Sequence, residues 1–276
     1  MRAGRRHHRW RIVAAVAIVV VLGGAGFVAV RYVFRSHPGP MSLGSAVKAF
    51  RGRESSTTVR NLRYDPPAQG VYALNGQGTE RISFPPNSQR DGAVMPASVR
   101  YLADGCWQWH VDYNVAHWEE YDFCPRGTQL LLVANRNSQS WDFGTLKINN
   151  LARIVCPPTT VVLPGDPQSG QALGWSCIGT NTATPGRTIE ATHARMVGMD
   201  TMQIGGVAIP TIHELQQITV TGAQRGTDTE NWWFAASSGL PVRMERHITL
   251  SSSSPLGTIT YDEAGSWQMT SLQPRT

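Results

Sequence analysis

The sequence predicts an all-β protein, mainly antiparallel sheet arranged as a half-barrel or a sandwich, preceded by one N-terminal transmembrane helix and a short amphipathic helix. Apolar and polar residues alternate along many short segments after Gly70, which indicates sheets with one buried face. Turn residues separate these segments at intervals of about 10 residues, a spacing that suits a sandwich, a half-barrel or a barrel. Outside the first 34 residues, one segment alone has a good helical pattern.

The first 34 residues have the pattern of a signal anchor. Residues 1–11 contain five arginines and no acidic residue, and residues 12–30 contain no charged residue. At 1.5 Å per residue, 19 uncharged residues nearly span a bilayer core of about 30 Å. We therefore predict a cytoplasmic tail at 1–11, a transmembrane anchor at 12–34, and an extracytoplasmic remainder. A cleaved signal peptide is the alternative, although its apolar region is usually shorter and no clear cleavage site follows.

The positive charge of the chain belongs to this anchor. The formal net charge is +6, but residues 1–35 hold seven arginines and no acidic residue, which leaves 25 − 7 = 18 basic against 19 acidic side chains. Binding to nucleic acid needs a clustered basic surface, and the remainder is close to neutral. We therefore expect the membrane, and not a nucleic acid, as a partner.

A linker and a short helix follow at residues 35–65. Leu43, Ala46, Val47 and Phe50 recur at the spacing of one helical face, and Ser42 precedes them as an N-cap. This helix is expected to be a spacer, or else to dock on the sheet or on a partner protein.

The β structure divides into a first region at 66–163, a loop-rich connection at 164–186 and a second region at 187–276. The connection, PGDPQSGQALGWSCIGTNTATPG, is the most linker-like part of the exported chain. The two regions form either one continuous domain or two small ones. The alternation is clearest in the second region, where every second position belongs to one face: Val242, Met244, Arg246, Ile248 and Leu250.

Residues 105–124, GCWQWHVDYNVAHWEEYDFC, predict a hairpin closed by a disulfide. A loop at residues 114–116 gives the pairs Tyr113–His117, Val111–Glu119, Trp109–Tyr121 and Trp107–Phe123, all on one face. On the other face His110 meets Glu120, and Cys106 lies opposite Cys124. Directly opposed Cα atoms are about 4.5–5.5 Å apart, within reach of a disulfide that adds about 3 kcal/mol.

The two remaining cysteines, Cys156 and Cys177, predict a second disulfide in the same oxidising compartment. Four cysteines allow three connectivities, and the sequential one closes two short, turn-rich segments. Zinc is the alternative for four cysteines, but the chain has no C-x-x-C and no common zinc spacing. We expect no metal and no other cofactor.

The hairpin also carries the most concentrated group of titratable side chains, namely His110, Asp112, Glu119, Glu120 and Asp122. Carboxylates near a histidine serve glycosidases and metal sites. In the predicted register, however, Glu119 points to the aromatic face and the other four to the opposite face. We therefore expect a solvated sheet face with a His110–Glu120 pair and no catalytic residue.

Two fragments resemble enzyme motifs without their context. His213–Gln217 (HELQQ) begins like a zinc-protease motif, but it lacks the second histidine and lies in a strand pattern. Gly174–Gly179 (GWSCIG) is close to a nucleophile elbow, but its closing glycine is one position late. No nucleotide-binding fingerprint is present. We read both fragments as coincidences.

Four tryptophans are candidates for a binding surface: Trp107, Trp109, Trp232 and Trp233. Large aromatic side chains usually fill β cores. Trp232 and Trp233 are adjacent in a strand, so one of them must lie on the face opposite to the core, covered by another element or exposed.

The chain resembles a group of uncharacterised, membrane-anchored, extracytoplasmic proteins of actinobacteria. The residues that carry this resemblance are the arginine-rich start with a single span, S-x-x-x-A-V-x-x-F-R at 42–51, G-V-Y at 70–72, G-C-W-x-W at 105–109 and W-E-E-Y-D-F-C-P at 118–125. Separately, NWWFAASSGLPVRMERHITL resembles the strand–turn–strand of lipoprotein-carrier-like half-barrels, which implies a curved sheet that holds an acyl chain.

These features predict a non-catalytic binding protein of the cell envelope, whose ligand is a lipid or another envelope component. A scaffolding partner of an envelope protein complex is one alternative. An extracytoplasmic hydrolase that uses the hairpin carboxylates is the other.

Overall fold

The computed structural model describes residues 38–53, 64–144, 146–255 and 257–276. The predicted cytoplasmic tail and transmembrane anchor lie outside the described residues. Among the residues described, no helix is long and apolar enough to cross a membrane. The described residues within 38–141 and 148–276 form one compact unit. Residues 142–147 belong to a second unit, in which the backbone N–H of Phe143 donates to the carbonyl of Leu146 at 2.8 Å.

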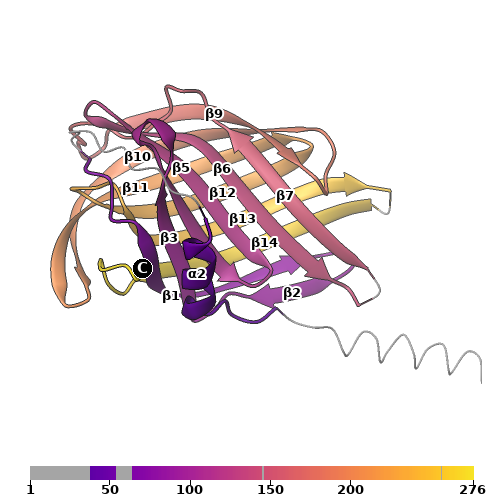
Figure 1. Cartoon of the computed structure of the whole chain (residues 1–276). Helices are drawn as coiled ribbons and strands as arrows, with labels where there is room; N and C mark the ends of the chain where they lie inside the picture. The colour runs from indigo at the N-terminus through magenta and orange to yellow at the C-terminus, as the bar shows by residue number, and fades with distance from the viewer. Residues whose placement is uncertain (1–37, 54–63, 145, 256) are drawn as a thin grey trace, which may run out of the picture. The chain divides into compact units, whose positions relative to one another are not determined.

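Strands make up nearly all of the described chain (Figure 1). The elements are α2 (Leu43–Arg51), β1 (Gly70–Ile82), β2 (Asn87–Arg90), β3 (Val94–Tyr101), the 3-10 turn η1 (Ala103–Gly105), β4 (Trp107–Asn114), β5 (His117–Arg126), β6 (Gln129–Asp142), β7 (Lys147–Val155), β8 (Val161–Leu163), β9 (Ala172–Asn181), β10 (Arg187–Ile204), β11 (Val207–Gly222), β12 (Gln224–Ala235), β13 (Pro241–Ser254) and β14 (Gly257–Met269).

The strands of the described chain form one sheet that closes on itself. Their order is β14-β13-β12-β11-β10-β9-β7-β6-β5-β4-β3-β1-β2, with β8 beside β6 and with β1 also paired to β14. Closure depends on β1, whose first half pairs with β3 while residues 74–82 pair with β14 on its other side. The predicted all-β antiparallel class is therefore confirmed. The half-barrel and the sandwich are wrong, because the β1–β14 pairing leaves neither strand as a free edge.

The short helix α2 is confirmed. Ser42 is its N-cap and accepts a hydrogen bond from the backbone N–H of Ser45 at 3.1 Å. The helix lies on β1 and β3 (Figure 1), and no residue of it is fully buried. At its C-terminal end, the Arg51 guanidinium donates to the backbone carbonyl of Thr276 at 2.5 Å. The helix therefore docks on the sheet, although most of its surface remains partly exposed.

The alternation predicted for the last strands fixes which side chains point inward. In β13, Val242, Met244, Arg246 and Ile248 are buried, whereas the residues between them are partly or fully exposed. The strand β4 differs, because all eight of its residues are buried. The second face of β4 is therefore also covered. This covering buries the charged side chains that β4 carries on that face.

Residues 164–186 differ from the loop-rich expectation, because they contain β9. Leu173 and Trp175 of this strand pack against the core, while Gly174 and Ser176, which alternate with them, are exposed. Gly174 and Ser176, which contribute to the linker-like composition, thus lie on the outer face of a regular strand. Strands from both sides of this segment belong to the same sheet.

Candidate functional site

The hairpin β4–β5 has the predicted register from Trp107 opposite Phe123 to Val111 opposite Glu119. Beyond Val111 the prediction is wrong, because His117 pairs with Asn114 and not with Tyr113. A β-bulge at this point lets Tyr113 stay buried on the aromatic face, where its ring stacks on His117.

Both predicted disulfides are formed. The Cα atoms of Cys106 and Cys124 are 4.2 Å apart, and those of Cys156 and Cys177 are 4.3 Å apart. The first bridge closes the hairpin, and the second joins the segment after β7 to β9. Among the described residues no cysteine is free.

The outer face of the hairpin is buried, so the predicted solvated face is wrong. His110 lies between Glu120, whose Oε1 is 3.1 Å from its Nδ1, and Asp112, whose Oδ1 is 3.0 Å from its Nε2. Arg136 from the neighbouring strand β6 pairs with Glu120 at 3.1 Å and with Asp122 at 2.8 Å. The predicted His110–Glu120 pair is confirmed, and Arg136 supplies a further positive charge to it.

Three of the four candidate tryptophans lie in the core. Trp107 and Trp109 are fully buried, and Trp232 is 3% exposed. Trp232 and Trp109 both pack against Trp267 of β14, at centroid distances of 6.0 and 5.9 Å. These three side chains are covered by their neighbours and present no outer surface.

The fourth candidate, Trp233, lies on the face of the strand opposite to Trp232. This is the arrangement expected for two adjacent residues of a strand. Its ring stacks on His213 at 4.2 Å, and the Arg243 guanidinium lies 4.6 Å above its centroid. Its indole N–H donates to Asp200 at 3.1 Å. Trp233 is therefore covered in part by neighbouring side chains.

Inside the closed sheet, an acidic cluster replaces the aromatic core toward one end of the strands. Glu119 of β5 and Glu263 of β14 share the guanidinium of Arg246, which donates at 2.7 Å to Glu119 and at 2.5 Å to Glu263. Tyr113 and Tyr121 also donate to Glu119, at 3.0 and 2.8 Å. All five side chains are buried.

Glu80 of β1 and His117 of β5 form a second buried pair in this cluster. Oε1 of Glu80 lies 2.8 Å from Nδ1 of His117, and both side chains have no exposed surface. Gln89 donates to the other oxygen of Glu80 at 2.7 Å, and Gln139 donates to the same oxygen. Asn137 lies 2.9 Å from Nε2 of His117. Every polar atom of this pair therefore has a neighbour.

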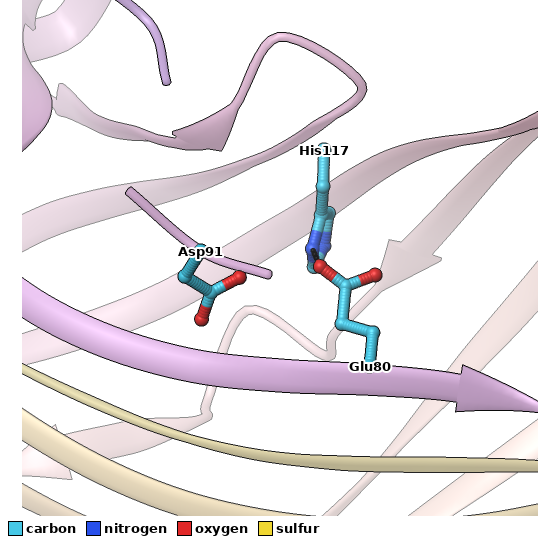
Figure 2. Close-up of side chains that lie close together, drawn as sticks. All are labelled: Glu80, Asp91 and His117. Carbon is cyan, nitrogen blue, oxygen red and sulfur yellow. Dashed lines mark hydrogen bonds and ion pairs between the residues drawn. The ribbon is translucent and has the colours of Figure 1, made fainter. Parts of the chain in front are cut away.

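Asp91 lies beside this pair, in the turn between β2 and β3 (Figure 2). Both of its carboxylate oxygens are buried, with less than 1 Å² exposed each, and neither has a hydrogen-bond partner among the residues that the structure describes. One ligand atom each from Glu80, Asp91 and His117 lies within 4.8 Å of the others. Two carboxylates and an imidazole at this separation are a donor set for a divalent metal ion.

The neighbouring strands β10, β11 and β12 add four inward-facing acids, which are Glu190, Glu214, Asp228 and Glu230. Trp232 donates to Glu230 at 2.7 Å, and Gln216 donates to Glu214 at 3.3 Å. Oε1 of Glu214 and Oδ1 of Asp228 are buried without a partner in the described parts of the chain. No basic residue of these strands pairs with the four acids in the same described parts.

Burial raises the pKa values of the interior acids that form no ion pair with a cation among the described residues. It raises the pKa of Glu214 to about 8 and the pKa values of Glu190 and Glu230 to about 7. Burial and the charges of Glu80 and Glu263 raise the pKa of Asp91 to about 7. Burial works against ionisation of Glu119 too, but the charges of Arg246 and His117 outweigh it and lower its pKa to about 2.

The carboxylates that contact the two histidines of the hairpin raise the pKa values of both imidazoles. Burial alone would lower the pKa of His117, but Glu80 outweighs it and raises that pKa to about 9. Burial is likewise outweighed at His110, whose pKa is raised by its bonds to Asp112 and Glu120. The His110–Glu120 pair expected on a solvated face is therefore buried, and the carboxylates of Asp112 and Glu120 favour the protonated form of His110.

Sequence reasoning missed most of the interior cluster, although two signals for it were present. The hairpin register places Glu119 on the aromatic face, and the alternation of β13 places Arg246 among apolar residues. Each marks an inward-facing charge. Glu80, Asp91 and His117 come from three segments that only the folded sheet brings together (Figure 2), so no spacing in the sequence could have revealed them.

No family model and no curated protein matches the chain. Among solved structures, it is similar to the hypothetical lipoprotein YmcC from Escherichia coli (K12), with 11% sequence identity and a TM-score of 0.35, over 82% of this chain and 98% of that one. At this identity and TM-score the similarity carries no inference about function. The actinobacterial resemblance and the membrane anchor remain predictions.

Proposed function

We propose that the protein is a non-catalytic binding protein of the cell envelope, held at the membrane by residues 12–34, whose closed sheet takes up a small cationic ligand. One observation carries the proposal. Within the described residues, the interior holds eight interacting acids against two cationic side chains, Arg246 and His117. The acids are Glu80, Asp91, Glu119, Glu190, Glu214, Asp228, Glu230 and Glu263.

Such an excess of buried acidic groups over cationic ones is costly for the protein alone. A buried carboxylate either ionises without a counter-charge or takes up a proton, and both are unfavourable when its oxygens lack partners. Both oxygens of Asp91 and Oε1 of Glu214 lack partners in this way among the described residues. A bound cation supplies the missing positive charge and the missing contacts, which is why these residues favour a cationic ligand over a neutral one.

The location and the ligand class rest on different features. The two disulfides support an oxidising, extracytoplasmic compartment. An acyl chain on the concave face of the sheet is the lipid version of a binding function, but it would have to displace the packed rings of Trp107, Trp109 and Trp267. The acidic cluster therefore favours a cation as the ligand.

A hydrolase that uses the hairpin carboxylates is less well supported. Glu120 and Asp122 each bind Arg136, and Glu120 also binds His110. Side chains held in this way neutralise one another, which favours a structural role for them.

An envelope scaffold is a second candidate function, and one surface feature favours it. Val155, Ile178 and Ile189 are paired side by side across β7, β9 and β10 and are 64%, 45% and 45% exposed. Rows of exposed apolar side chains are typical of contact surfaces. Crosslinking in the native host, with and without residues 42–51, tests whether one protein neighbour is bound.

Native mass spectrometry of the full-length protein from its native host tests the binding function. We expect a mass above that of the chain with two disulfides, and we expect denaturation to release the added mass as a cationic species. A mass that always equals the oxidised chain, together with no change in melting temperature on addition of metal ions or polyamines, would contradict the proposal.

A further inference from the structure

We propose that Glu80, Asp91 and His117 form a binding site for a first-row divalent metal ion, with Zn²⁺ and Mn²⁺ as the probes. The inference rests on the proposed function and names the class of its ligand. The three residues come from β1, from the turn after β2 and from β5, and their side chains converge in the interior of the closed sheet (Figure 2).

The main chain fixes the position of Asp91. Its backbone N–H donates to the carbonyl of Gly78 at 3.1 Å, and the next N–H, of Gly92, donates to the carbonyl of Tyr113 at 2.7 Å. The turn is thus bonded to β1 on one side and to β4 on the other. A ligand held in this way loses little freedom when it binds a metal ion.

Two glycines make room for the Asp91 carboxylate. Gly78 and Gly265 lie directly opposite each other in the β1–β14 pairing that closes the sheet. A Cβ at Gly78 would lie 1.9 Å from Oδ2 of Asp91, and a Cβ at Gly265 would lie 3.1 Å from the same oxygen. The carboxylate can therefore enter this interior position because position 78 has no side chain.

At that position the Asp91 carboxylate accepts no hydrogen bond from the described residues. Both oxygens are buried and lack a hydrogen-bond partner, which is rare for a group that binds water strongly. Glu80 and His117 already have bonded neighbours, so neither of them relieves Asp91. A group that contacts both carboxylates and the imidazole would supply the missing partner, because one ligand atom from each residue lies within 4.8 Å of the others.

A divalent metal ion fits that description. Metal–ligand distances of about 2.0–2.2 Å bring ligand atoms on opposite sides of the ion to roughly 4.4 Å from each other. The three ligand atoms here lie within 4.8 Å of one another, so a shift of a few tenths of an ångström closes the site. The ion takes the place of the proton between Nδ1 of His117 and Oε1 of Glu80, and that proton leaves to solvent.

The neighbouring side chains orient the proposed ligands and leave their negative charge available to a metal ion. Gln89 and Gln139 donate to the oxygen of Glu80 that faces away from His117, which orients that carboxylate. Arg246 is a cation that also influences Asp91, but its guanidinium is bound by Glu119 and Glu263. Once His117 gives up the proton that it shares with Glu80, no neighbouring cation of the described chain balances the carboxylates of Glu80 and Asp91, and a divalent ion matches their combined charge.

Equilibrium dialysis and thermal unfolding of the full-length protein, purified without a polyhistidine tag, test this site. We expect one Zn²⁺ or Mn²⁺ per chain, and we expect saturation at a hundred times Kd to raise Tm by roughly 5–10 °C. Asp91→Asn should weaken metal binding at least about 10-fold. It should fold without metal, because it removes an unpaired charge and keeps the shape of the side chain.

Asp262→Asn is the matched control, because Asp262 is exposed on β14 beside the same cluster and should bind metal as the wild type does. Wild-type protein that binds neither ion, or an Asp91→Asn variant that binds with unchanged affinity, would overturn the metal site. If native mass spectrometry then finds an organic cation, the proposed function stands without the metal. If it finds no ligand at all, both proposals fail.

Discussion

Glu119 and Glu120 are neighbours on β5, but they point to opposite faces of the strand and have different charged partners. Glu120 faces outward, where His110 and Arg136 lie 3.1 Å from its oxygens and Arg53 lies 3.4 Å away. Glu119 faces inward to a region where one arginine serves two glutamates and where several further carboxylates have no cation. The outer cluster is balanced in charge, whereas the inner one, within the described residues, has eight acidic side chains for two cationic ones.

The difference separates a structural role from a binding role. Carboxylates that meet their own cations, as on the outer face, stabilise the contact between β4, β5 and β6 and need nothing more. Carboxylates buried without a cation lower the stability of the fold, and residues that break local rules in this way are expected at functional sites. The following experiments test whether the two faces really differ in this respect.

Loss of Arg246 should have the largest effect. Arg246→Met leaves Glu119 and Glu263 buried without their cation, and we expect a loss of about 3–5 kcal/mol in the free energy of unfolding at pH 7. Urea denaturation measures it. Arg243→Met on the same strand, with a side chain 37% exposed, is the control and should cost no more than about 1 kcal/mol. Equal losses for both variants would mean that the interior ion pairs are unimportant.

The pH dependence of the free energy of unfolding should have the second-largest effect, because it reports the protons held by the interior acids. The raised pKa values of Glu214 (about 8) and Glu230 (about 7) mean that the folded state keeps protons which the unfolded state releases above about 4.5. This contribution is complete below about 4.5 and disappears as the pH rises through 7 and 8. Stability should therefore fall between pH 5 and pH 8.

Glu214→Gln should flatten that profile, because glutamine resembles the protonated acid. We expect the variant to be more stable than the wild type at pH 8 by about 1–3 kcal/mol, and to differ little at pH 5. Glu245→Gln, on the outer face of β13, should leave the profile unchanged. A wild-type stability that increases from pH 5 to pH 8 would contradict the assignment of the interior acids.

On the outer face, His110→Gln should lower the stability of the fold, whereas Glu214→Gln in the interior should increase it. The pKa of His110 is raised, so its charged bonds to Asp112 and Glu120 stabilise the fold fully below about 6.5 and are lost as the pH rises through the folded-state pKa. We expect a loss of about 1–2 kcal/mol at pH 5 and a smaller loss at pH 8. His247→Gln is an exposed control. A loss that grows with pH would show that His110 is neutral in the fold.

The smallest effect should come from Asp122→Asn. Its partner Arg136 has a side chain that is 30% exposed, so water screens the pair, and we expect a change within about 1 kcal/mol. Unfolding in low and high salt measures it. A loss as large as that of Arg246→Met would remove the distinction between the two faces.

The sequence by itself determined the local structure. Alternation gave the strands and their inward faces, the spacing of Cys106 and Cys124 gave the hairpin and its disulfide, and a capped apolar stripe gave α2. Even the inward directions of Glu119 and Arg246 follow from the period of a strand. These features depend on residues close in sequence, whose geometry the backbone repeats impose.

Only the tertiary structure decided closure and the site. Closure pairs Leu74 with Met269, a contact between residues far apart in the chain, which no local pattern encodes. The same pairing sets Gly78 opposite Gly265 and so opens the position that the Asp91 carboxylate enters. A strand pattern shows which way a side chain points, but which charges it meets there depends on the strands that closure brings together, and that difference separates a paired carboxylate from an unpaired one.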